Sequence, residues 1–118
     1  MKSYTDLEQS KKLAEILSIN SADAFYDMAE PEKRQVPIIG NPDDYYDMED
    51  WTLPCWSLAA LLVVLPERLI KPYYVPCLQK EDGKYSVAYG DDILLCKANN
   101  PIDACVEMIV KLKENNLI

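Results

Sequence analysis

An uninterrupted apolar run, residues 58–65, constrains the fold of this chain more than any other part of its sequence. A helix built from such a run has no polar face, so neighbouring elements must cover it on most sides. The run is too short for a membrane span, which needs about 20 such residues. Thr52 is a suitable cap, and Pro54 is tolerated in a first turn. We therefore expect a buried helix over residues 53–65 that includes Leu61 and Leu62 in the core.

The N-terminal part of the chain favours helices. Leucine and alanine recur at helical spacing over residues 6–18, and Thr5 with Glu8 matches a capping box. We expect a first helix there. A short second helix is predicted over residues 21–29, with Ser21 as its cap.

The pattern changes to alternation in the second half. Residues 72–97 predict an antiparallel meander, with Asp82-Gly83 as a hairpin turn and Pro76 on an edge strand or bulge. A further short strand is predicted over residues 35–39.

A final helix is predicted over residues 101–114, with Asn100 as N-cap and Pro101 in its first position. The length of 118 residues suits one domain, residues 1–118. The expected fold is α+β: a three- or four-stranded antiparallel sheet with about three helices, packed mainly on one face.

Negative charge is concentrated in one part of the chain. The formal net charge is −8, and residues 21–50 hold nine acidic residues against Lys33 and Arg34. Such a surface repels phosphate backbones, so we expect no direct nucleic-acid binding. It favours a basic protein as partner instead.

The chain has no histidine, which removes the commonest general acid or base and the commonest metal ligand. None of the three glycines belongs to a phosphate-binding loop, and Ser57 lacks both the surrounding elbow motif and a histidine base. We expect no metal, no cofactor and no catalytic residue.

The four cysteines match no zinc or redox spacing. The first twelve residues lack the apolar core of a secretory signal. We therefore expect a cytoplasmic protein whose cysteines are reduced, buried and structural. The cysteines are Cys55, Cys77, Cys96 and Cys105.

The segment 43–51 is the main candidate site. It mixes carboxylates with aromatic residues, which is typical of interface hot spots, whereas it lacks the glycine and the final bidentate glutamate of a calcium loop. A solvated acidic loop is the plainer interpretation. The candidate partner-binding residues are Asp43, Asp44, Tyr45, Tyr46, Asp47 and Trp51.

Two stretches, Leu53 to Leu62 closed by Leu65-Pro66, and Asn100 to Ala104 followed by Met108 and Leu117-Ile118, carry a resemblance. They resemble short, uncharacterised acidic proteins carried by phages and mobile elements of gut anaerobes. The resemblance implies a bacterial cytoplasm and an element-encoded role. It implies no activity, ligand or catalytic residue.

Residues 73–112 also resemble the antitoxin half of HicA/HicB-type toxin–antitoxin pairs, through a strand, an Asp-Gly hairpin, two strands and a capped helix. That resemblance implies a small basic toxin as partner.

Three functions therefore stay open. The first is a non-enzymatic interaction protein that uses an acidic, tyrosine-rich surface. The second is a small enzyme or ligand-binding domain with an aromatic pocket near Trp51, Trp56 and Tyr73. The third is an antitoxin-like protein.

Overall fold

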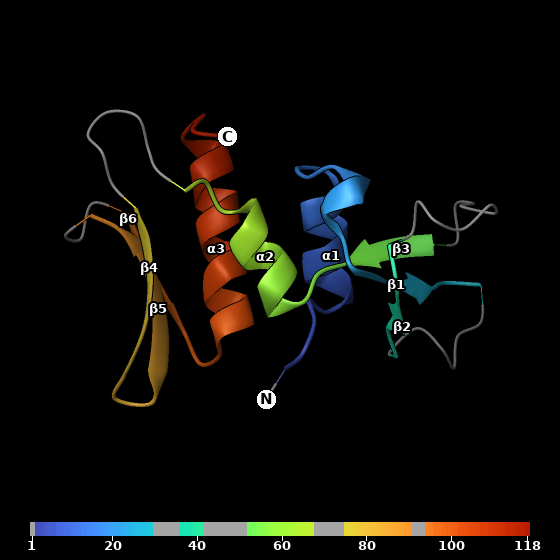
Figure 1. Ribbon diagram of the computed structural model, residues 1–118, viewed down its shortest axis with the longest axis horizontal. Helices are drawn as coiled ribbons and strands as arrows, with labels where there is room; N and C mark the ends of the chain where they lie inside the picture. The colour runs from blue at the N-terminus through green and yellow to red at the C-terminus, as the bar shows by residue number, and fades with distance from the viewer. Residues whose placement is uncertain (1, 30–35, 42–51, 68–74, 91–93) are drawn as a thin grey trace.

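The computed structural model describes residues 2–29, 36–41, 52–67, 75–90 and 94–118. These residues form two three-stranded antiparallel sheets and three α-helices, which confirms the expected α+β class. The molecule measures 44 × 30 × 20 Å along its principal axes. Figure 1 shows the two sheets at opposite ends of the long axis, with the helices between them. The sequence predicts the sheet in the C-terminal half of the chain as a whole. Of the other sheet it predicts one strand, over residues 35–39, which the structure confirms at Ile38–Ile39.

The predicted meander is confirmed as the sheet β4-β5-β6. Asp82 and Gly83 join the first two strands with φ values of 53° and 75°, the left-handed backbone that a two-residue hairpin requires. Pro76 is the first residue of β4, an edge strand, so its missing N–H interrupts no ladder. The strands are β4 (Pro76–Glu81), β5 (Lys84–Tyr89) and β6 (Leu94–Ala98).

Helix α3 (Pro101–Glu114) covers one face of this sheet, with the bounds that the sequence predicts (Figure 1). The Asn100 side chain accepts a hydrogen bond of 2.9 Å from the Asp103 amide, which confirms Asn100 as the N-cap. Eight of its residues are buried, and alternate residues of β5 and β6, among them Val87 and Cys96, are buried opposite them. This packing forms the larger part of the core.

Helix α1 (Leu7–Ala14) confirms the first predicted helix in a shorter form, but not its cap. Asp6 is the N-cap: its carboxylate accepts from the Gln9 amide at 2.8 Å, and the Gln9 side chain accepts from the Asp6 amide at 3.0 Å. The predicted capping box of Thr5 with Glu8 is wrong, because the box is formed one residue later by Asp6 and Gln9. Thr5 is buried, and its hydroxyl is hydrogen-bonded to Ser10 instead.

The predicted helix over residues 21–29 is wrong. After a short 3-10 helix η1 (Ile19–Ser21), residues 24–27 form β1, the central strand of a second sheet. The two strands beside it supply the backbone hydrogen bonds that a helix would have made internally. The spacing of residues within 21–29 does not reveal these distant partners. The sheet order is β2-β1-β3, with β1 (Ala24–Asp27), β2 (Ile38–Ile39) and β3 (Thr52–Cys55).

The predicted helix over residues 53–65 is correct only in its second half. Residues 52–55 form strand β3, and Pro54 is tolerated there because β3 is an edge strand. Helix α2 (Leu58–Val64) begins after Ser57, whose side chain accepts from the Ala60 amide at 3.2 Å. Ser57 therefore replaces Thr52 as the cap. No helix among the described residues is long and apolar enough to cross a bilayer.

The α2 helix is less completely covered than the sequence predicts. Leu61 is fully buried and packs in the main core between α2 and α3, whereas 43% of Leu62 is exposed. Val63 is also exposed. A smaller apolar cluster of Ala24, Tyr26 and Cys55 lies between the second sheet and the start of α1.

Candidate functional site

The residues that the sequence nominates for binding all lie outside the described residues. They are Asp43, Asp44, Tyr45, Tyr46, Asp47 and Trp51. Of the predicted aromatic pocket only Trp56 is described, since Trp51 and Tyr73 also lie outside. Trp56 is fully buried, and its Nε1 donates to Ser21 Oγ at 2.9 Å. It is a core residue.

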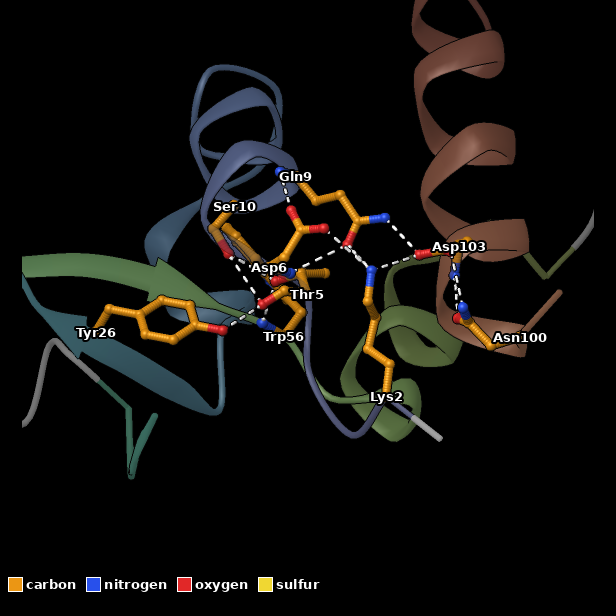
Figure 2. A network of polar contacts seen from close by, with 9 residues as sticks. All are labelled: Lys2, Thr5, Asp6, Gln9, Ser10, Tyr26, Trp56, Asn100 and Asp103. Carbon is orange, nitrogen blue, oxygen red and sulfur yellow. Dashed lines mark hydrogen bonds and ion pairs between the residues drawn. The ribbon is translucent and has the colours of Figure 1, made fainter. Parts of the chain in front are cut away.

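A buried polar cluster anchors the N-terminal segment to the second sheet (Figure 2). Thr5 and Ser10 are fully buried and share a hydrogen bond of 2.7 Å between their hydroxyls. The Trp56 amide donates to Thr5 Oγ1 at 3.1 Å, and the Tyr26 hydroxyl donates to the Thr5 carbonyl at 2.7 Å. No buried side-chain nitrogen or oxygen in the described part of the chain lacks a partner. This cluster is therefore structural.

A second polar cluster joins the N-terminal segment to the start of α3 (Figure 2). Lys2 Nζ and Gln9 Nε2 reach the same Asp103 oxygen, at 2.7 and 2.6 Å. Burial by itself raises the pKa of Asp103, but hydrogen bonds from Lys2, Gln9 and Asn100 outweigh it and hold that pKa below its ordinary value. The carboxylate therefore stabilises the fold above its ordinary pKa, and this contribution is lost as the pH falls.

The described surface has a hollow with a mainly apolar lining, which we call the η1–α2 hollow. Its volume is about 480 Å³. Three separate parts of the chain line it: residues 20–23, residues 39–41, and Ala59, Ala60 and Val63 of α2. The exposed fraction is 76% for Ile39 and 85% for Val63. None of the described residues that line the hollow is aromatic, and Trp56 is not among them.

Hydrogen bonds hold the rim of the hollow in place. Asn41 Nδ2 donates to the carbonyls of Asn20 and Ala22, both at 2.9 Å. Ser21 Oγ donates to the Ser18 carbonyl at 2.6 Å and accepts from Trp56. These contacts fix η1 relative to Asn41, just after β2, and to Trp56, two residues before the start of α2.

Asp23, which lines the hollow, is hydrogen-bonded to Ser57 at the start of α2. The Asp23 carboxylate accepts from the Ser57 amide at 2.9 Å and also from the Ser57 hydroxyl. That hydroxyl in turn accepts from the Ala60 amide as the helix cap. The Ser57 hydroxyl therefore donates to Asp23 and accepts as the cap of α2, and so links β1 to the start of the helix.

The cysteines follow the expectation at three of four positions. Cys55, Cys96 and Cys105 are buried, and burial raises the pKa of Cys55 to about 12 and that of Cys105 to about 11. Cys77 is exposed, which corrects the prediction that all four are buried. It lies on β4, on the face of the sheet opposite α3, which no described helix covers. No group of three His, Cys, Asp or Glu side chains suited to a metal occurs among the described residues.

One thiol should therefore react in the native protein. With a thiol-specific reagent at neutral pH we expect fast modification of Cys77 and modification of the other three only after denaturation, because they are buried and protonated. Mass spectrometry of peptides after native labelling identifies the modified residue. Labelling of Cys55 or Cys105 at a rate similar to that of Cys77 would contradict this assignment.

The η1–α2 hollow is the described feature best suited to binding. The side chains of Ser21, Asp23 and Asn41 in its lining make internal hydrogen bonds, and most of its exposed lining is apolar. The residues that line the hollow come from distant segments of the chain, so no local motif marks it. The one indirect sign in the sequence is the apolar run 58–65, which has no polar face. No protein-family model matches the chain, and no curated protein or solved structure matches it.

Proposed function

We propose that this protein is a non-enzymatic interaction protein of the cytoplasm that binds a basic protein through its acidic, tyrosine-rich segment 43–51. The mobile-element origin implied by the resemblance of residues 53–66 and 100–118 belongs to the same proposal. The binding residues are Asp43, Asp44, Tyr45, Tyr46, Asp47 and Trp51.

One observation carries the proposal: the chain enters the acidic segment at the rim of an exposed apolar hollow. Asn41, two residues before Asp43, is fixed on that rim by two hydrogen bonds. Beside it, Ile39 and Val63 expose aliphatic surface. Apolar surface next to concentrated charge is the composition of a protein-binding surface, where the charge steers the partner and the apolar contact holds it.

The alternatives have less support. The hypothesis of an enzyme or ligand-binding domain depends on an aromatic pocket, and the described member of that pocket, Trp56, is a core residue. The antitoxin-like hypothesis keeps its strand and helix order in residues 76–114, but this order alone is weak support for a function. Both it and the main proposal take a basic protein as partner.

Neutralising the acidic segment tests the proposal. In the triple variant Asp43→Asn, Asp44→Asn, Asp47→Asn we expect an unchanged or higher melting temperature, since closely spaced like charges repel. Binding of a fluorescent lysine-rich peptide at low salt, followed by anisotropy, should weaken several-fold. Added salt should weaken binding to the wild type in the same way.

A matched triple variant separates the local site from the overall charge. Glu8→Gln, Glu81→Gln, Asp82→Asn removes the same charge from exposed positions outside the segment. It should bind the peptide as the wild type does. If both triple variants lost the same affinity for the peptide, net charge rather than the acidic segment would account for the binding. Unfolding of the first variant would show that its carboxylates hold the backbone or a cation.

A further inference from the structure

The outer face of α2 carries aliphatic surface that the described fold does not cover. Ala59, Leu62 and Val63 are exposed on this face, and the helix has no polar residue. Leu61 and Leu65, on the other side, are buried in the main core. Across the η1–α2 hollow, Ile39 faces the same opening. An exposed patch of this kind on a small protein marks an interaction surface.

The hollow selects an aliphatic group rather than a polar ligand. The side chains of Ser21, Asp23 and Asn41 at its rim make the internal hydrogen bonds described above. Ala22 and Ala60, which also line the hollow, are nearly buried and have only a methyl side chain. A small polar ligand would find few convergent hydrogen-bonding groups there, whereas a leucine or isoleucine side chain would gain contact on three sides.

Charge indicates which macromolecule supplies this group. Asp23 is an acidic residue of the described lining, and the lining segment 39–41 is followed in the chain by the acidic segment 43–51. A second copy of this chain brings the same net charge of −8 and is repelled. A segment with lysine or arginine around its aliphatic residues is complementary.

The strand next to the hollow is a poor template for strand addition. β2 has only two residues, and Pro37, directly before it, has no N–H to offer a new strand. Helix α2, in contrast, presents a ridge of aliphatic side chains against which another helix can pack. The helix-in-groove mode, with anchors three or four residues apart, fits this surface.

We infer that the η1–α2 hollow receives an aliphatic anchor from a basic amphipathic helix of the partner protein. This rests on the proposed function, because the acidic segment supplies the attraction for the basic residues of that helix. The hollow adds selection for the apolar face of that helix. Charge alone would bind any lysine-rich chain, whereas the hollow distinguishes chains of equal charge.

Two synthetic peptides of equal length and charge test the inference. One is a helical leucine–lysine peptide with its leucines on one face, and the other replaces every leucine by serine. We expect the wild type to bind the first about tenfold more tightly, the effect of burying one or two aliphatic side chains. Val63→Ser and Ile39→Ser should each remove most of this preference, measured as the ratio of the two dissociation constants.

Val75→Ser is the matched control, because Val75 is 63% exposed and is not among the residues that line the hollow. It should keep the full preference. The inference is overturned if Val75→Ser loses as much of the preference for the leucine–lysine peptide as Val63→Ser does, or if Val63→Ser keeps the whole preference. In either case the proposed function stands. Failure of both peptides to bind the wild type overturns both. Two further outcomes also overturn the inference. If the wild type dimerises and Val63→Ser does not, a second copy of the chain occupies the hollow. If Val63→Ser loses stability but keeps the preference, the chain itself covers the hollow.

Discussion

Replacement of Leu61 by alanine is expected to lower the free energy of unfolding by about 2–5 kcal/mol, whereas the same change at Leu62 should cost less than about 1 kcal/mol. Leu61 has no exposed surface and contributes to the main core between α2 and α3. Its truncation leaves a cavity that neighbours fill only in part. Leu62 is 43% exposed, so its truncation removes little buried contact.

Urea denaturation of the two variants measures this difference. The pair is well matched, because both residues lie in α2 and the propensity change from leucine to alanine is the same. Unchanged slopes of the unfolding free energy against urea would show that the change lies in stability rather than in compactness. Similar losses in both variants would mean that the outer face of α2 is covered in solution.

Unfolding at alkaline pH is the second large effect. Burial raises the pKa of Cys55 to about 12, of Cys105 to about 11, and of Tyr26 and Tyr89 to about 12. Their ordinary values are 9.0 for the thiols and 10.0 for the phenols. Each folded value lies above the unfolded one, so the stabilisation is complete below about pH 9 and is lost as the pH rises toward 12.

The structure gives a reason beyond burial for the raised pKa of each tyrosine. The Tyr26 hydroxyl donates to the Thr5 carbonyl and the Tyr89 hydroxyl to the Pro66 carbonyl, both at 2.7 Å. Ionisation would remove the donor and place a negative charge beside a carbonyl oxygen. Because a tenfold change in a protonation equilibrium corresponds to about 1.4 kcal/mol, the four groups together contribute several kcal/mol, which is comparable to the stability of a small domain.

Circular dichroism during a titration from neutral pH to pH 12 should therefore show cooperative unfolding. In urea denaturation, the stability deficit of Cys105→Ala relative to the wild type should shrink as the pH rises past about 9, because the variant lacks one raised pKa. Cys77→Ala, at the exposed thiol, should show no such trend. A protein that stays folded at pH 12 would refute the burial of these groups.

The sequence predicts α3 with the correct bounds because its determinants are local. Asn100, Pro101 and the apolar stripe that follows act within one or two turns of the helix. The Asp82-Gly83 hairpin is equally local, since a two-residue turn with positive φ has few alternatives. In both places the residues that decide the structure are neighbours in the chain.

Residues 24–27 and 52–55 show where sequence reasoning fails. Ala22, Phe25 and Met28 have helical spacing, and Thr52 with Pro54 resembles a helix start. The structure pairs the two segments as β1 and β3, with Ala24 opposite Cys55 and Asp27 opposite Thr52. Short segments of this kind are compatible with either state, and the hydrogen bonds made by the distant partner decide between them.

By itself the sequence determined the α+β class, the C-terminal meander and helix, and the central place of the apolar run. The tertiary structure decided which side of that run is buried, because a run without polar residues carries no period that distinguishes Leu61 from Leu62. It also decided that Cys77 is exposed and that the η1–α2 hollow exists. The hollow combines residues 20–23 and 39–41 with Ala59, Ala60 and Val63 of α2, and only the packed fold brings segments so far apart in the chain to one surface.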